Sequence, residues 1–206
     1  MHAGVLVCGG KSTRFGDDDK VRAPLAGKPL IRRVADGIEP AIDELVVNCR
    51  EAQWEAIEVA LDGYGHEVTP AFDGRPDAGP MHGIKQGLEA TNAEYAVVVA
   101  CDMPFVDPNF VRYLFRRAQN HEGAIPRYGE GGWYQPLQAV YEVAAMVAAI
   151  REAEAEGIDR PINAARKLDF VTVEGEELWS TTDEWTFFNV NTTADLEEAL
   201  AHLESE

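Results

Sequence analysis

The sequence predicts an α/β fold built on a doubly wound, mostly parallel twisted sheet, a three-layer α/β/α arrangement of the Rossmann-like type. Short apolar runs without polar alternation, such as residues 3–8 and 95–101, are typical of parallel strands covered on both faces. Strand and helix patterns alternate four times, and polar residues follow the strands. Because ligands of such sheets bind at the carboxyl ends of the strands, we expect the functional site there.

The elements follow one another at the spacing of strand and helix units. Strands are predicted at residues 3–8, 45–47, 66–68 (weakly) and 95–101, and helices at 29–38, 53–61, 83–90 and 109–119. Beyond residue 123 we expect a glycine-rich turn at 129–132, a strand at 137–141, an alanine-rich helix at 143–156, and a helix, a strand and a last helix at 194–203. No linker or repeat interrupts this order, which predicts a single domain over residues 1–206.

Composition excludes several classes of function. The 36 acidic residues against 18 basic ones leave a net charge of −18, which disfavours binding to nucleic acid and to anionic membranes. Only five of the 18 cations are lysine, so the acidity fits solvation in a high-salt, halophilic cytoplasm. No apolar run reaches the length of a membrane span. The cysteines at 8, 49 and 101 end apolar runs without metal-ligand spacing, as expected for buried thiols in the cytoplasm.

A glycine-rich, basic segment follows the first predicted strand. Gly9 and Gly10 lack a Cβ and can bring backbone N–H groups close to phosphate oxygens. Seven of the 18 Lys and Arg residues lie between positions 11 and 33. The spacing of a P-loop fails, because Val5 stands where its first glycine belongs, and the spacing of a dinucleotide fingerprint fails as well. The segment is therefore predicted to be a phosphate cradle of another kind, and Asp17, Asp18 and Asp19 to be a solvated turn or a metal site.

Three further segments carry candidate chemistry. Asp102 follows the strongest strand, where an α/β enzyme holds Mg²⁺, although a helix-capping role explains the residue equally well. The loop from Asp73 to Gly83 suits a base or a sugar, or is an ordinary connection. Its His82 is expected to be a surface or packing residue rather than a catalyst. Residues 188–192 precede the last helix, whose start their Asn and Thr side chains could cap.

The order of these segments resembles that of the molybdenum cofactor guanylyltransferases, over nearly the whole chain. The shared segments are Gly9-Gly10, Arg14-Phe15-Gly16, Lys20, Leu25-Ala26-Gly27-Lys28-Pro29-Leu30, Val46-Val47-Asn48, Asp73, Gly79-Pro80 with Gly83, Cys101-Asp102-Met103-Pro104, Gln135-Pro136-Leu137 and Asn189-Val190-Asn191-Thr192. This chain departs from the family at Cys8, Phe15, Met81-His82 and Thr193. The resemblance implies the fold of the nucleotide-diphospho-sugar transferases.

The resemblance also implies a reaction and its residues. Enzymes of that family transfer GMP from GTP to the terminal phosphate of molybdopterin and release pyrophosphate. By this resemblance the nucleotide-binding residues are Leu6, Cys8, Gly9, Gly10, Lys20, Asn48, Asp73 and Asp102, with Asn48 and Asp73 reading guanine; the catalytic residues are Arg14, Lys20 and Asp102; the metal ligand for Mg²⁺ is Asp102; and the acceptor-side residues are Gly79, Pro80, Asn189 and Asn191. An ionised phosphate attacks in line, so no strong general base is required.

Other functions fit parts of the pattern. A molybdopterin cytidylyltransferase and an adenosylcobinamide-phosphate guanylyltransferase share the chemistry and a similar first motif. A nucleotide-binding regulatory protein is a non-enzymatic alternative, which the presence of both Lys20 and Asp102 in the sequence disfavours. A dinucleotide-binding oxidoreductase lacks the required glycine spacing.

Overall fold

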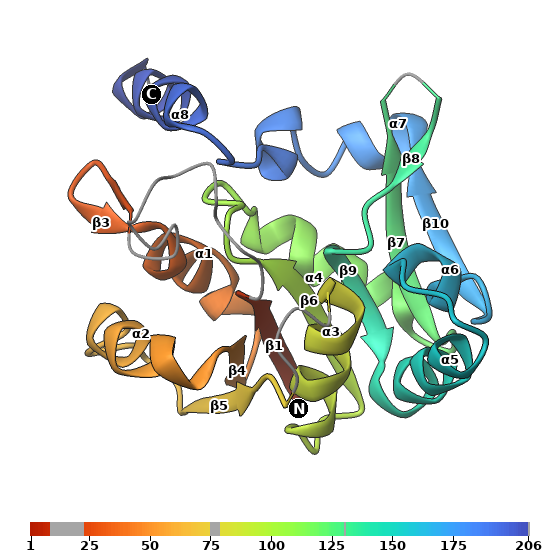
Figure 1. Ribbon diagram of the computed structural model, residues 1–206. Helices are drawn as coiled ribbons and strands as arrows, with labels where there is room; N and C mark the ends of the chain where they lie inside the picture. The colour runs from red at the N-terminus through yellow and green to blue at the C-terminus, as the bar shows by residue number, and fades with distance from the viewer. Residues whose placement is uncertain (9–22, 75–78, 130, 206) are drawn as a thin grey trace.

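The structure, a computed structural model, describes residues 1–8, 23–74, 79–129 and 131–205. A central sheet carries helices on both faces (Figure 1). The strands are β1 (His2–Val7), β2 (Pro24–Leu25), β3 (Lys28–Pro29), β4 (Glu44–Cys49), β5 (Val68–Phe72), β6 (Tyr95–Ala100), β7 (Gly123–Tyr128), β8 (Trp133–Tyr134), β9 (Gln138–Glu142) and β10 (Phe170–Glu174). The helices are α1 (Leu30–Ile38), η2 (Glu39–Ala41), η3 (Glu51–Gln53), α2 (Trp54–Ala60), α3 (Gly79–Glu89), α4 (Pro108–Ala118), α5 (Val143–Ala155), α6 (Pro161–Ala165), α7 (Gly175–Trp179), η4 (Glu184–Phe187) and α8 (Thr193–Ser205).

The strands of the main sheet lie in the order β10-β7-β9-β6-β1-β4-β5, with β8 paired to β7. β1 is central and runs parallel to both of its neighbours, so that Val5 lies opposite Val46 on β4 and Val98 on β6. β9 is antiparallel to both β6 and β7. The sheet is therefore mixed but mostly parallel, which confirms the predicted fold class.

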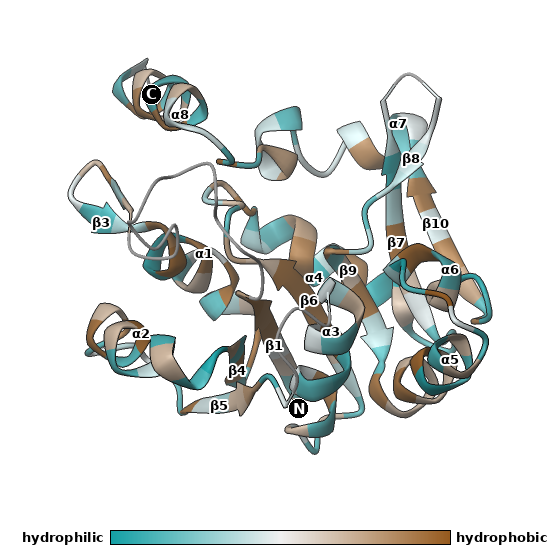
Figure 2. Cartoon of the chain, viewed as in Figure 1, coloured by the Kyte–Doolittle hydropathy of each residue, from teal (hydrophilic) through white to brown (hydrophobic). Residues whose placement is uncertain are grey.

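Alternate residues of each strand feed one of two hydrophobic cores. On β4, Val47 faces the core that α1, α2 and α4 cover, whereas Val46 faces the core beneath α3, α5 and α6. The strands β1 and β6 are mostly apolar, whereas the helices around them carry polar as well as apolar residues (Figure 2). This double burial is why the strands read as unbroken apolar runs, and it produces the predicted three layers. Within the described ranges, no helix is long and apolar enough to cross a bilayer.

Several boundaries differ from those predicted. The strand predicted at 66–68 is wrong: β5 begins at Val68, because the edge strand is only half-buried and contains Pro70, which weakens its sequence pattern. Helix α3 starts at Gly79 rather than at residue 83. The β2–β3 hairpin was not predicted, because its strands are two residues long and its turn places Ala26 at φ 48°.

The segment that leads to α8 crosses the carboxyl ends of the strands (Figure 1). Its buried Thr186 hydroxyl accepts hydrogen bonds from Gln138 Nε2 at 2.9 Å and from the backbone N–H of Asp107 at 3.1 Å. Further along, the backbone N–H of Val190 donates to the carbonyl of Asp102 at 2.9 Å. These bonds fix the C-terminal segment over the edge of the sheet at which a ligand is expected.

Phe110 on α4 ties that segment to the core, and its truncation should be costly. Its fully buried ring meets the ring of Phe187 edge-on at 5.7 Å. We expect Phe110→Ala to lower the free energy of unfolding by about 3–5 kcal/mol through lost apolar burial and the cavity left behind. Urea denaturation measures this loss. Val59→Ala is the control, since Val59 is 73% exposed, and it should change the same quantity by about 0.5 kcal/mol or less. A loss below about 1 kcal/mol for Phe110→Ala would show that the core refills the space.

Candidate active site

Four predicted residues gather at the carboxyl edge of the sheet. The N–H of Cys8 donates to the carbonyl of Asn48 at 2.9 Å, so the ends of β1 and β4 stay paired. The N–H of Asp73 donates to the carbonyl of Cys49 at 3.0 Å, which holds the residue after β5 against β4. Asp102 follows β6 on the other side of β1. The chain thus brings polar groups from four neighbouring strands to a single edge.

Asn48 and Asp73 are joined by their side chains. The Asn48 amide nitrogen donates to Asp73 Oδ1 at 2.9 Å and to the carbonyl of Ala71 at 3.0 Å. Asn48 is fully buried, whereas Asp73 is half-buried. The carboxylate of Asp73 is therefore held at the edge by a buried amide and still reaches solvent.

Asp102 does not cap the helix that follows it, so that alternative is wrong. The cap of α4 is Asp107, whose Oδ1 accepts a hydrogen bond from the N–H of Asn109 at 2.7 Å. Asp102 is half-buried and lies between β6 and the C-terminal segment, to which its backbone carbonyl is bonded. The Asp102 carboxylate thus lies at the carboxyl edge of the sheet, where the sequence predicts the metal ligand.

The donor set fits Mg²⁺ bound together with a substrate. Within the described ranges, no group of three or more His, Cys, Asp or Glu side chains could hold a metal ion. Mg²⁺ usually keeps several waters and binds through one or two carboxylates plus substrate phosphates, so the Asp102 carboxylate suits such an ion. A site made only of protein ligands is not what these residues offer.

The other predicted residues occupy different environments. The side chain of Leu6 is fully buried in the core and that of Cys8 nearly so; Cys49 and Cys101 are buried as well, as predicted. Gly79, at φ +80°, and Pro80 are exposed at the start of α3. Gly9, Gly10, Arg14 and Lys20, as well as Asp17, Asp18 and Asp19, lie outside the described residues, so their predicted roles stay predictions.

His82 is a packing residue, as predicted. Its Nδ1 lies 3.7 Å from Glu154 Oε1, and Lys85 makes a short ion pair with the same carboxylate. Burial raises the pKa of Glu154, but the hydrogen bonds from Lys85 and His82 outweigh it, so the net pKa lies below the ordinary value. These contacts tie α3 to α5.

Three cations of the basic segment serve the local structure. Lys28 and Arg32 both bind Asp36, each at 2.6 Å, and Arg33 donates to the carbonyl of Leu25 at 2.8 Å. Burial raises the pKa of Asp36, but the hydrogen bonds from Lys28 and Arg32 outweigh this effect, so the net pKa lies below its ordinary value. The excess of positive charge between positions 11 and 33 is thus partly structural.

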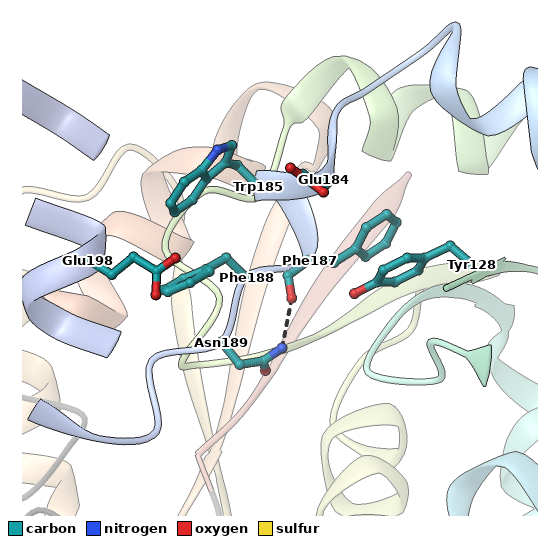
Figure 3. Close-up of a pocket in the computed structure, with 7 residues that line it drawn as sticks. All are labelled: Tyr128, Glu184, Trp185, Phe187, Phe188, Asn189 and Glu198. Atoms are coloured by element: carbon teal, nitrogen blue, oxygen red, sulfur yellow. Dashed lines mark hydrogen bonds between the residues drawn. The ribbon is translucent and has the colours of Figure 1, made fainter. Parts of the chain in front are cut away.

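A pocket of about 390 Å³ lies beside the C-terminal segment (Figure 3). Its lining is aromatic and acidic: Tyr128, Glu184, Trp185, Phe187, Phe188, Asn189 and Glu198. The Tyr128 ring stacks on Phe187 at 4.4 Å, and the Asn189 amide donates to the carbonyl of Phe187 at 2.8 Å. Burial, together with the negative charge of Glu184, raises the pKa of the Tyr128 phenol. The phenol is therefore a hydrogen-bond donor at neutral pH.

Sequence reasoning found only Asn189 among these pocket residues. The signal it passed over is the aromatic-rich stretch directly before Asn189, with Trp185, Phe187 and Phe188. Asn191 does not line the pocket; it is exposed, and its backbone N–H donates to Asp195 Oδ2 at 2.7 Å. The capping role considered for this segment is confirmed for Thr192, whose hydroxyl accepts from the N–H of Asp195 at 3.2 Å.

A mostly parallel sheet with carboxylates after β5 and β6, and with a glycine pair after β1 in the sequence, is typical of an α/β enzyme that binds a nucleotide at the carboxyl ends of its strands. The family model of the MobA-like NTP transferase domain matches residues 4–169. The chain belongs to this family of enzymes.

Named relatives agree with this assignment. A probable molybdenum cofactor guanylyltransferase of Natronomonas pharaonis is 43% identical over 200 residues, which are 97% of each chain. A protein of the same name from Haloferax mediterranei is 39% identical over 94% of this chain and 90% of its own. The crystal structure of molybdopterin-guanine dinucleotide biosynthesis protein A from Archaeoglobus fulgidus matches with a TM-score of 0.80 at 28% identity over the whole of both chains. A 4-diphosphocytidyl-2C-methyl-D-erythritol synthase from Anaerococcus prevotii shares the fold, with a TM-score of 0.74 at 12% identity and 98% of each chain covered.

Proposed function

We propose that this nucleotidyltransferase transfers GMP from GTP to the terminal phosphate of molybdopterin and releases pyrophosphate. The observation that carries the proposal is the placement of Asp73 and Asp102 at one edge of the sheet, after β5 and β6. With β1 and β4 between these strands, the two residues are separated by three strand spacings, roughly 14 Å. A nucleoside triphosphate laid across this edge places its base at one carboxylate and its phosphates at the other.

Asp73 is the residue proposed to select guanine. The N1–H and the N2 amino group of guanine are two adjacent donors, which a carboxylate accepts together, and adenine lacks this pair. The hydrogen bond from Asn48 holds the Asp73 carboxylate in place. Discrimination between the bases then follows from a fixed, half-buried acceptor that the wrong base leaves unpaired.

The phosphates are proposed to lie beside Asp102 and against the segment that follows β1 in the sequence. Gly9 and Gly10 offer backbone N–H groups, and Arg14 and Lys20 offer positive charge, roles that rest on the sequence alone. Asp102 would hold Mg²⁺, which neutralises phosphate charge when bound. An ionised acceptor phosphate attacks the α-phosphorus of GTP, a new phosphoanhydride bond forms, and the bond to the β-phosphate breaks. Positioning and charge neutralisation by these residues suffice for this step.

The aromatic pocket is proposed to hold the acceptor. The Val190–Asp102 backbone bond places its wall beside the proposed metal ligand. The aromatic lining supports this proposal, because a flat pterin ring packs favourably against aromatic side chains. The carboxylates of Glu184 and Glu198 could accept hydrogen bonds from its amino and ring N–H groups. The pocket volume lies within the range of small-molecule sites.

The test is pyrophosphate release from GTP, CTP and ATP, each offered with molybdopterin or with adenosylcobinamide phosphate. Turnover with GTP and molybdopterin alone supports the proposal. Turnover with CTP points to a cytidylyltransferase, and turnover with the cobinamide to the other guanylyltransferase. Nucleotide binding without release in any combination points to a regulatory protein.

Asn189→Ala should weaken binding of the acceptor and leave binding of the nucleotide unchanged. Asn189 lines the aromatic pocket, and the loss of one hydrogen-bonding group there should raise the KM for molybdopterin roughly tenfold. The KM for GTP should stay within about twofold, because Asn189 is not part of the nucleotide edge. Steady-state pyrophosphate release measures both constants. Asn109→Ala, an exposed change on α4, is the control, and a larger effect on GTP than on molybdopterin would remove Asn189 from the acceptor side.

A further inference from the structure

Asn48 is a polar residue in an otherwise apolar row. On β4 it follows Val46 on the face that packs beneath α3, where Val5, Val7 and Ile84 form the core. Its side chain is fully buried. A buried amide costs free energy unless it is hydrogen-bonded, so apolar packing alone does not account for this residue.

Two acceptors fix how the Asn48 amide is oriented. The carbonyl of Ala71 and the Oδ1 of Asp73 both lie within 3.0 Å of Nδ2, and each requires a donor. The amide nitrogen must therefore face β5, and Oδ1 must face α3. Within the described ranges this buried Oδ1 has no hydrogen-bond partner. Both amide hydrogens of Asn48 are thus used within the protein, and one of them holds Asp73.

Gly83 lets α3 lie against this amide. A Cβ on Gly83 would be 2.3 Å from Asn48 Oδ1 and 3.1 Å from its Cγ, far inside contact distance. Gly83 lies within α3, so its backbone does not require glycine; the space above Asn48 does. A Cβ on Gly87, one turn later, would be at the same 2.3 Å from Val5 Cγ1, and so presents an equal steric problem away from Asn48.

We infer that Gly83 and Asn48 are positioning residues for guanine selection: the missing side chain of Gly83 sets the place of Asn48, and Asn48 sets the plane of the Asp73 carboxylate. This inference rests on the proposed role of Asp73 and goes beyond it, because the selectivity for the base then depends on a helix residue that touches neither base nor carboxylate. Asp73 Oδ1 accepts one hydrogen bond from Asn48 and keeps a lone pair with which it can accept a second one from the base.

The experiment compares the dissociation constants of GTP and of inosine triphosphate, which lacks the N2 amino group. Calorimetric titration of the folded protein, without acceptor, measures both. The wild-type protein should prefer GTP roughly tenfold or more, the value of one hydrogen bond to a charged acceptor. Asp73→Asn should reduce this preference to within about twofold. Gly83→Ala should lower it at least fivefold, whereas Gly87→Ala, with a matched clash in the same helix, should leave it within about twofold of wild type.

A double variant separates positioning from damage to the fold. Asn48→Ala removes the oxygen that the methyl group of Gly83→Ala would meet. By itself this change should lower the preference for GTP. Adding Gly83→Ala to it should lower the preference no further. Unfolding temperatures identify variants that fail to fold. Where one of them fails, Asn48→Ser is measured in its place, and it should lose the preference for GTP over inosine triphosphate as well. An unchanged preference in Asp73→Asn would overturn the proposed reading of guanine. A loss in Asp73→Asn together with equal preferences in Gly83→Ala and Gly87→Ala would overturn the positioning role alone.

Discussion

Replacing Asp102 by asparagine lowers the rate of pyrophosphate release by about a thousandfold, the result expected if this carboxylate holds the metal that neutralises the phosphates. Asparagine keeps the shape of the side chain and removes its charge. The backbone bond between Val190 and the Asp102 carbonyl does not involve the side chain and should persist. Steady-state turnover with GTP as a function of Mg²⁺ concentration measures the loss, and the unfolding temperature shows that the fold is retained.

Asp107→Asn is the matched control for this change. Asp107 lies five residues further on and caps α4 through its side chain, a role that asparagine also performs well. Turnover of this variant should stay within about twofold of wild type. Retention of more than about a tenth of the wild-type rate by Asp102→Asn, with unchanged dependence on Mg²⁺, would exclude Asp102 as the essential metal ligand.

Replacing Lys20 by alanine should lower turnover by a factor of about 10²–10³, because a fixed positive charge that stabilises the developing phosphate charge is lost. The control is Lys28→Ala. Lys28 belongs to the same basic stretch, but its ammonium group already pairs with Asp36 at 2.6 Å and lies at the surface. Its loss should change turnover by no more than about twofold.

The two lysine variants test the phosphate cradle directly. Single-turnover measurements at saturating GTP separate a loss in the chemical step from a loss in nucleotide binding. Equal, small effects of both substitutions would mean that the positive charge of residues 11–33 serves solvation and local structure only. A large effect of Lys28→Ala alone would move the cradle to the β2–β3 hairpin.

The layers and the site edge could be predicted because they depend on local patterns. Each central strand is buried on both faces and so appears as an unbroken apolar run, and a ligand edge follows from parallel strand direction. β5 was misplaced because an edge strand with Pro70 loses that signal. β7, with Pro126 inside it, and the two-residue strands escaped for the same reason: pairing in the sheet, not local pattern, makes them strands.

The aromatic pocket could not be predicted because its walls come from distant parts of the chain. Tyr128 ends β7, Trp185 lies in η4 and Glu198 on α8. Only the tertiary contacts of Thr186 with Gln138 and Asp107 bring the η4 segment to the sheet edge. The Asn48–Asp73 bond is similar, since it joins residues 25 positions apart through the register of two strands.

The bond from Val190 to the Asp102 carbonyl joins main chain to main chain, so it asks for no particular side chain at either end. Exposed residues of the C-terminal segment, such as Asn191, can therefore be exchanged while this bond persists, provided that the buried Thr186 and Phe187 are kept. Under the proposed function, natural variation or deliberate grafting of another tail would alter which molecule receives the nucleotide without changing the residues proposed to bind GTP. Recognition of donor and recognition of recipient would then be able to evolve separately.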